Sequence, residues 1–202
     1  MRYVIARVFA STHRIEVLGF DNLPEHGPVL MLGNHISWLD WAMIQIACPR
    51  PVRFAMDRGI YNRWYLKWFF DLFRVVPISG GHSKQALQTM NELLLAGEVV
   101  CLFPEGAISR NGQLGEFKRG YEKTVEGVSE GVILPFYLRG LWGSRFSSSS
   151  EALQESRNTG LRGDVIVAFG APLPMDTPAP ELKRHVFELS IDAWDQHTRT
   201  LD

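Results

Sequence analysis

A histidine and an aspartate stand five positions apart just after an apolar run. The run covers residues 28–32, Gly33-Asn34 interrupts it, and His35-Ile36-Ser37-Trp38-Leu39-Asp40 follows. In a continuous α-helix, residues five apart point about 140° away from each other, so His35 must lie in a turn outside the helix to meet Asp40. An imidazole oriented by a carboxylate can act as a general base, because the carboxylate fixes the ring tautomer and stabilises the imidazolium.

The same residues have a purely structural interpretation. Ser37 and Asp40 fit the pattern of a capping box, in which Ser37 covers an amide at the start of a helix and Asp40 lies in its positive first turn. Residues 41–47 continue as a short apolar helix. Capping and catalysis therefore both remain open for Asp40, and a cap would help to hold its carboxylate in place.

A second carboxylate follows a second predicted strand. The strand at 98–103 ends in Phe103-Pro104-Glu105-Gly106. In parallel α/β sheets, ligands bind at the carboxyl ends of the strands. Glu105 by itself would be an ordinary exposed turn residue, but its placement after a strand, like that of His35, predicts that the two face one cleft.

Seven apolar runs with strand character supply the elements that must position these groups. They lie at 15–19, 28–32, 52–56, 74–78, 98–103, 132–138 and 164–169. Helical periodicity separates several of them, at 41–47, 84–96 and 180–198. This alternation predicts an α/β fold over residues 1–202, a single domain with a mostly parallel sheet of about seven strands flanked by helices. The polar segment 147–163 is predicted to be a long loop, either a surface connection or a lid.

Composition narrows the class of protein further. The 202 residues are 46% hydrophobic and carry a formal net charge of −1, which argues against a general nucleic-acid binder. Cys48 and Cys101 lie far apart, so reduced thiols in a cytoplasmic setting are expected, and no metal or cofactor site is indicated. The first apolar stretch contains Arg7 and is too short for a transmembrane helix or signal peptide, so we expect lipid contact only at the membrane surface.

Residues 50–74 combine aromatic side chains with positive charge. They include six basic residues against two acidic ones. Within this window, residues at helical spacing form one aromatic face: Tyr61, Trp64, Tyr65, Trp68, Phe69 and Leu72. Such a face predicts a membrane-interface helix, with Trp64, Tyr65, Trp68 and Phe69 in contact with lipid, although the same face could cover the core of the domain.

The order Asn34-His35-x-Ser37-x-x-Asp40, then Phe103-Pro104-Glu105-Gly106, resembles the two signature blocks of the glycerolipid acyltransferases, typified by the 1-acylglycerol-3-phosphate acyltransferases. Weaker similarities at 52–58, 117–120 and 132–136 extend the resemblance over residues 14–140. It implies a glycerol-3-phosphate acyltransferase-like fold. It also implies transfer of an acyl group from an acyl thioester, acyl-CoA or an acyl carrier protein, to a free hydroxyl of a lysophospholipid, without a bound cofactor.

The resemblance also implies roles for individual residues. His35 would take the proton of the acceptor hydroxyl while Asp40 orients the imidazole, and amides at the start of the following helix could meet the charge that develops on the thioester carbonyl. The turn at Glu105 and Gly106 would bind the acceptor, with Glu105 accepting hydrogen bonds from its glycerol portion and Ser37 beside it. Basic side chains near the turn would bind its phosphate: Arg58, Arg110 and Lys118.

The chain departs from the family pattern after Gly106. Many members that form phosphatidic acid continue with Thr-Arg-Ser, whereas this chain has Ala107-Ile108-Ser109. A phosphate monoester benefits from several charge-assisted contacts, and Ile108 removes one cation. We therefore expect an acceptor with a head group, such as lysophosphatidylethanolamine, with 1-acylglycerol-3-phosphate as the alternative.

Two other classes of protein compete with an acyltransferase. Residues 127–131 match the Gly-x-Ser-x-Gly pattern of a serine hydrolase around Ser129, with Asp164 or Asp176 and His185 downstream. The nucleophile elbow requires a strand before the serine, whereas here the predicted strand follows it. A non-catalytic lipid-binding module would need the apolar surface, but not His35 and Asp40 together.

Overall fold

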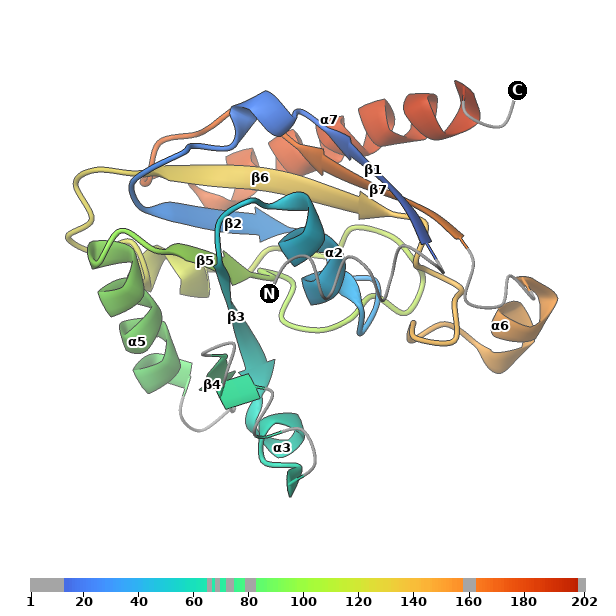
Figure 1. The fold of residues 1–202 in the computed structure, drawn as a ribbon, viewed down its shortest axis with the longest axis horizontal. Coiled ribbons are helices and arrows are strands. Elements are labelled where there is room, and N and C mark those ends of the chain that lie inside the picture. The colour runs from blue at the N-terminus through green and yellow to red at the C-terminus, as the bar shows by residue number, and fades with distance from the viewer. Residues whose placement is uncertain are drawn as a thin grey trace.

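The computed structural model describes residues 13–64, 67, 70–71, 75–78, 83–157 and 163–199 (Figure 1). Seven strands form one sheet in the order β1-β7-β6-β2-β5-β3-β4. Their bounds are His13–Leu18 (β1), Val29–Gly33 (β2), Val52–Asp57 (β3), Val76–Ile78 (β4), Val99–Leu102 (β5), Val132–Arg139 (β6) and Gly163–Phe169 (β7).

The sheet is mostly parallel. Strands β2 to β6 all run in one direction, whereas β7 is antiparallel to β6 and parallel to the edge strand β1. The predicted α/β fold with seven strands is therefore confirmed, and the reversal of the β1–β7 pair is a feature that the sequence pattern did not indicate. Strand β2 lies at the centre and is buried along its whole length, which explains its continuous apolar run.

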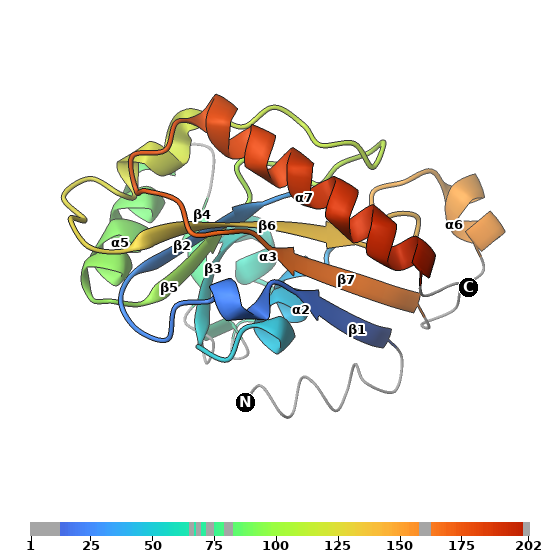
Figure 2. The same ribbon diagram turned by 90° about the horizontal axis from the view of Figure 1, so that it is seen from above.

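Helices cover both faces of this sheet (Figure 2). On one face, Ala42 and Met43 of α2 (Asp40–Ala47) pack in the same core as Val29 and Met31 of β2. On the other face, α5 (Ser83–Leu95) and α7 (Ala179–Arg199) pack with Leu30 and Leu32. Successive β2 side chains thus point into two different cores, one on each face of the sheet. This packing holds β2 in place and so fixes where the chain, and hence His35, leaves the sheet.

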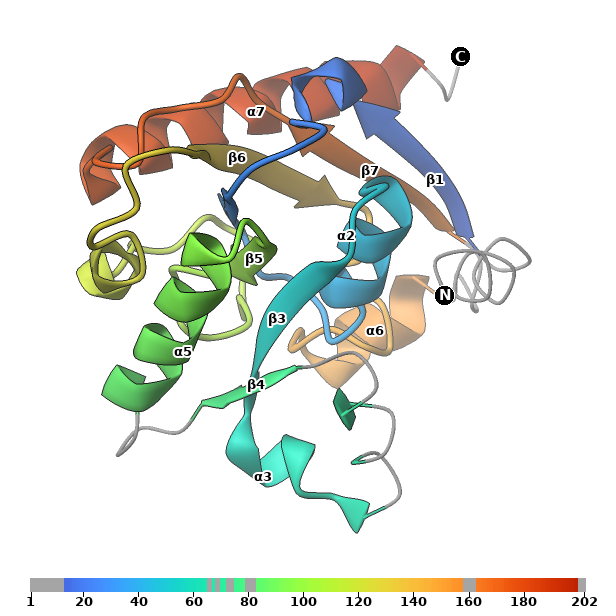
Figure 3. The ribbon, with the colours of Figure 1, turned by 60° about the vertical axis from the view of Figure 1, so that its left-hand side comes forward.

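Two connections differ from the sequence prediction. A short helix, α6 (Glu151–Arg157), lies in the segment predicted as loop, because its residues are good helix formers although they lack an apolar stripe. The predicted aromatic helix is interrupted near its start, since α3 (Arg58–Tyr61) ends before a break at Asn62 and Arg63; residues 65, 66, 68, 69 and 72 of the predicted helix lie outside the described residues. With β3 and β4, α3 extends to one end of the molecule (Figure 3).

Two short 3-10 helices complete the described elements, η1 (Phe20–Asn22) after β1 and η2 (Arg119–Lys123) before β6. Among the described residues, no helix is both long and apolar enough to span a bilayer.

Candidate active site

His35 and Asp40 are in direct contact. The Nδ1 atom of His35 lies 2.7 Å from Oδ2 of Asp40. His35 occupies the turn between β2 and α2, and Asp40 is the first residue of α2, as the spacing predicts. Because Nδ1 faces a carboxylate, we assign its proton to that side, which leaves Nε2 unprotonated and able to accept a proton. The His35 side chain is 21% exposed, so solvent and small groups can reach the ring.

The carboxylate of Asp40 is held by three donors on one oxygen. Besides the His35 ring, Oδ2 accepts the backbone N–H groups of Ile36 at 2.7 Å and Ser37 at 3.0 Å. Asp40 is fully buried, and this burial raises the pKa of its carboxyl group, whereas the bonds from His35 and the two amides act in the opposite direction.

Ser37 positions this turn. Its hydroxyl accepts the N–H of Leu39 at 3.2 Å and donates to the carbonyl of Phe146 at 3.1 Å. Of the two bonds of the predicted capping box, the one from the Ser37 amide to Asp40 forms, whereas the Ser37 hydroxyl bonds to the amide of Leu39 and the Asp40 amide bonds to the Ser37 carbonyl at 3.3 Å; α2 itself begins only at Asp40. Ser37 is fully buried and its bonds give it a structural role, while its contact with substrate stays a prediction.

The amides predicted to face the thioester carbonyl are occupied. Ile36 and Ser37 donate to Asp40, Trp38 donates to the carbonyl of Phe146 at 2.9 Å, and Leu39 donates to Ser37. That amides at the start of the helix stabilise the oxyanion stays a prediction, and these four would have to exchange their present acceptors to do so. These amides instead build the turn that holds His35 against Asp40.

Glu105 contacts the histidine through the backbone. Its Oε1 accepts the His35 N–H at 2.9 Å, and its Oε2 accepts the Gly115 N–H at 2.9 Å. Partial burial raises the pKa of Glu105, against the effect of these two bonds and of the nearby His35. The sequence correctly predicts that strands β2 and β5 bring the two residues together, but the contact joins a carboxylate to a main-chain amide.

Sequence reasoning missed two further supports of the histidine. The Phe103 ring stacks on the imidazole with centroids 4.0 Å apart and 12° between the planes. The buried side chain of Asn34 bonds to both main-chain groups of Leu138, at 2.9 Å to the carbonyl and 2.7 Å from the amide, and so extends the pairing of β2 with β6 beyond Gly33. Two sequence signals could have indicated these supports: a polar residue, Asn34, directly after the buried strand β2, and an aromatic residue, Phe103, directly after strand β5.

Lys118 is the basic residue that the structure brings to the Pro-Glu-Gly turn. Gly106 adopts φ +74°, and a Cβ atom built on it would fall 2.7 Å from Lys118 Nζ, so the ammonium group lies directly over this glycine. The bond from the Lys118 amide to the carbonyl of Pro104, at 2.9 Å, fixes the backbone there. Arg58 and Arg110 are exposed at the surface, on α3 and in the loop after Gly106.

Part of the predicted membrane face lies outside the described residues, namely Tyr65, Trp68 and Phe69. Trp64 is 86% exposed. Phe70, by contrast, is buried and stacks on Tyr61 with centroids 6.0 Å apart. Aromatic residues within 50–74 thus lie both in the core and on the surface.

The structure separates the residues of the serine-hydrolase alternative. Ser129 lies three residues before β6, and Asp164 is the second residue of β7, which runs antiparallel beside the end of β6. Ser129 and Asp164 thus lie toward opposite ends of β6. His185 lies on α7 beside Glu181 and Glu188. No strand leads into Ser129, so the nucleophile elbow is absent there.

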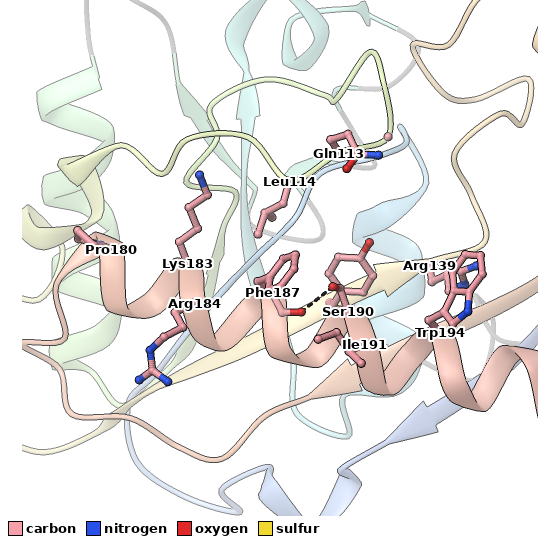
Figure 4. A pocket seen from close by; sticks show the side chains of 12 residues that line it. Gln113, Leu114, Arg139, Pro180, Lys183, Arg184, Phe187, Ser190, Ile191 and Trp194 are labelled. Carbon is pink, nitrogen blue, oxygen red and sulfur yellow. Dashed lines mark hydrogen bonds between the residues drawn. The ribbon is translucent and has the colours of Figure 1, made fainter.

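A separate groove of about 820 Å³ lies between α7 and the loop at residues 112–114 (Figure 4). Leu114 and Phe187 point toward each other across it, and Arg139 stacks on Trp194 at one end, 4.0 Å from the ring centroid. None of the predicted site residues lines this groove. Among the described residues, no group of three side chains is arranged to hold a metal ion.

The site thus combines a histidine–aspartate pair with a Pro-Glu-Gly turn at the carboxyl ends of two parallel strands. Residues 14–139 match the family described as Acyltransferase, and the chain belongs to this family. Similar sequences include the chloroplastic 1-acyl-sn-glycerol-3-phosphate acyltransferase LPAT1 of Arabidopsis thaliana, 28% identical over 77% of this chain and 46% of that protein. The 1-acyl-sn-glycerol-3-phosphate acyltransferase of Pseudomonas aeruginosa is 29% identical over 65% of this chain and 51% of that protein.

The fold is also similar to a solved structure. The crystal structure of PlsC, the 1-acyl-sn-glycerophosphate acyltransferase of Thermotoga maritima, superposes with a TM-score of 0.70 at 19% identity, over 96% of this chain and 77% of that one. This likeness confirms the predicted acyltransferase-like fold. The chain spans about half the length of the plant relatives that it matches.

Proposed function

We propose that this protein is an O-acyltransferase that moves a fatty acyl group from an acyl thioester to the free hydroxyl of 1-acylglycerol-3-phosphate. The observation that carries the proposal is the contact of His35 Nδ1 with Asp40 Oδ2 at 2.7 Å, in a partly exposed turn with Nε2 available as a base. The names of several relatives favour this acceptor, which was the alternative from sequence, over a lysophospholipid with a head group.

The reaction requires one proton to move twice. Nε2 of His35 takes the hydroxyl proton as the acceptor oxygen attacks the thioester carbonyl, and the Asp40 carboxylate stabilises the resulting imidazolium. The tetrahedral intermediate then expels the thiolate, which receives the proton from Nε2. One ester bond forms and one thioester C–S bond breaks, so no acyl-enzyme and no metal ion are required.

Basic side chains near the Pro-Glu-Gly turn would bind the phosphate of the acceptor. Lys118 lies over Gly106 and supplies a cation where the sequence has Ile108 in place of the usual arginine. Arg110 follows in the same loop, and Arg58 is exposed on α3. Because Lys118 offsets the missing arginine, the argument from Ile108 for a head group is weakened, and lysophosphatidylethanolamine becomes the second candidate acceptor.

The lipid substrates require access from a bilayer. We infer peripheral contact with the cytoplasmic side of a membrane through the surface around Trp64, which is 86% exposed. Sedimentation with phospholipid vesicles tests this inference. Trp64→Ala should reduce the bound fraction, whereas Leu95→Ala, which removes another exposed apolar side chain on α5, should not. Equal binding of the two variants and the parent would contradict it. The donor is proposed to be acyl-CoA or an acylated carrier protein.

An acyl-transfer assay tests the proposed activity. A labelled acyl thioester is offered with 1-acylglycerol-3-phosphate or with lysophosphatidylethanolamine, and product formation is followed for the parent and His35→Ala. We expect transfer to the phosphate acceptor and its loss in His35→Ala. Near-normal turnover of that variant would refute the role of His35.

A variant and its matched control test the proposed contact of Lys118 with the acceptor phosphate. Lys118→Ala should raise KM for the phosphate acceptor, because the removed ammonium lies over the Pro-Glu-Gly turn. Lys123→Ala removes an exposed cation from η2 and should leave KM unchanged. A strong preference of the parent enzyme for lysophosphatidylethanolamine would favour the second candidate instead.

A further inference from the structure

The loop at 105–115 forms hydrogen bonds with both main-chain groups of His35, its N–H and its carbonyl. The His35 N–H donates to Glu105 Oε1 at 2.9 Å, and the His35 carbonyl accepts the N–H of Ser109 at 2.7 Å. Main-chain groups at a strand-to-helix turn need partners of this kind, because neither the sheet nor the helix supplies them. The histidine is thus held at its backbone by a segment about 70 residues later in the chain.

We infer that Glu105 is a positioning residue, whose carboxylate sets the place of the catalytic histidine by bridging its amide to that of Gly115. The inference rests on the proposed function, in which His35 is the base. It replaces the role implied by the family resemblance, in which Glu105 accepts hydrogen bonds from the acceptor. The two roles make opposite predictions for kcat and KM.

Both carboxylate oxygens of Glu105 are committed to the protein. Oε1 serves His35 and Oε2 serves Gly115, each at 2.9 Å. Gly115 packs so closely that a Cβ atom built on it would fall 2.7 Å from Oε2. A carboxylate placed in this way is directed by two fixed amides, and a ligand would have to compete with both of them.

The position of the histidine main chain depends on the bonds from Glu105 and Ser109, because the contacts of Asp40 and Phe103 hold the ring. Asp40 bonds to Nδ1 and Phe103 stacks on the imidazole face, so neither of these contacts holds the main-chain N–H or carbonyl of His35. Proton transfer requires Nε2 within hydrogen-bond reach of the acceptor hydroxyl, and a small misplacement lowers the rate strongly. The Glu105 and Ser109 bonds are what tie this assembly to strand β5.

Glu105→Gln tests the inference. Glutamine keeps one acceptor oxygen but presents an NH₂ group in place of the other, so the amide of His35 or of Gly115 loses its partner. We expect kcat to fall about 10- to 100-fold, with KM for the acceptor within about twofold of the parent. Glu116→Gln is the matched control, since it makes the same change directly after this loop, at a side chain that is 91% exposed and pairs with Lys183 of α7 and not with His35; it should retain parental kcat.

A second variant displaces the carboxylate without removing its charge. In Gly115→Ala, the new methyl group would lie only 2.7 Å from Oε2, so the flexible Glu105 side chain must move. The same loss in kcat is expected, even if Glu105→Gln does not fold. A rise in acceptor KM with kcat preserved, in whichever of the two variants folds, would overturn the inference and return Glu105 to acceptor binding.

Hydrogen exchange of the two amides gives a readout that needs no turnover. In ¹⁵N-labelled protein, Glu105→Gln should accelerate exchange at His35 or Gly115 at least about tenfold, and Glu116→Gln should not. Unchanged exchange at both amides would refute the bridge. If exchange responds as expected but the parent protein transfers no acyl group to either acceptor, the proposed function fails while the positioning role of Glu105 stands.

Discussion

Asp40→Asn separates the catalytic role of Asp40 from its role at the start of α2. Asparagine has the same shape, and its carbonyl oxygen can replace Oδ2 as acceptor for the His35 ring and the amides of Ile36 and Ser37. The tautomer and the cap can therefore survive. Only the negative charge beside the ring is lost.

The size of the effect follows from the geometry. Opposite unit charges 2.7 Å apart attract by about 6 kcal/mol at an effective dielectric constant near 20. The amide oxygen of asparagine retains part of this attraction, so we expect the imidazolium to lose about 3 to 5 kcal/mol. That loss applies in the transition state, when the ring is charged, and it lowers kcat about 10²- to 10⁴-fold.

Stability should change much less than activity. Burial raises the pKa of Asp40, which means that the folded protein holds this charge at a cost that the neutral asparagine avoids. Against this, Oδ1 of Asp40 has no hydrogen-bond partner within the described part of the chain, so an NH₂ group there would be unpaired. We expect the free energy of unfolding to remain within about 1 kcal/mol of the parent.

Two measurements on the same preparation check this prediction. Initial rates of thioester cleavage with a saturating acceptor give kcat, and urea denaturation gives the free energy of unfolding. Ser37→Ala is the control, because it removes the hydroxyl bonds of the turn but keeps the Asp40 charge, and we expect it to retain most of kcat. A folded Asp40→Asn variant with kcat within about threefold of the parent would refute the reasoning and leave Asp40 as a helix cap.

Three further predictions concern the elements around the site. Gly33→Ala should lower the free energy of unfolding, measured by urea denaturation, by about 3 kcal/mol, because the new Cβ atom would fall 2.2 Å from the Phe136 carbonyl oxygen. Gly97→Ala is the control: its Cβ atom would have no neighbour within 4 Å, and only the strain of φ +79° should lower the free energy of unfolding, by about 1 kcal/mol. Asn34→Leu should cost about 2 to 4 kcal/mol and lower kcat, since it leaves two main-chain groups of Leu138 unpaired; unchanged stability would contradict this. Burial raises the pKa of Glu105 above 4.5, so its stabilising contribution is present at lower pH and is lost as pH rises through the folded-state pKa. The parent should therefore lose stability relative to Glu105→Gln as the pH rises above about 4.5, and equal slopes in urea titrations would contradict this.

The central strands could be predicted because their side chains are buried on both faces. A run such as 28–32 has no polar interruption, and its burial in the structure follows directly. The direction of β7 and β1 could not be predicted, since an apolar run carries no sign of whether its neighbours run parallel or antiparallel. The helix α6 was missed because its residues favour a helix by intrinsic propensity alone, without apolar periodicity.

The part of the site that is formed by contacts between two side chains could be predicted. The spacing of His35 and Asp40, with a break between strand and helix, was enough to predict their contact. The bonds of Glu105 to main-chain amides were beyond reach, because every residue except proline carries the same amide and the sequence does not distinguish them. The occupied amides of residues 36–39 were missed for the same reason, since their acceptors include the distant Phe146.

The contact with Phe146 sets a lower limit on how short a working fragment of this protein can be. The Phe146 carbonyl accepts bonds from the Trp38 amide and the Ser37 hydroxyl, yet it lies beyond residue 139, where the match to the family ends. A fragment trimmed at that boundary would keep His35 and Asp40 but leave two donors of their turn without an acceptor. A fragment made for fusion to another protein should therefore retain at least the serine-rich segment 144–150; it should also retain β7, which joins the edge strand β1 to β6, and α7, which packs on β6 and β7.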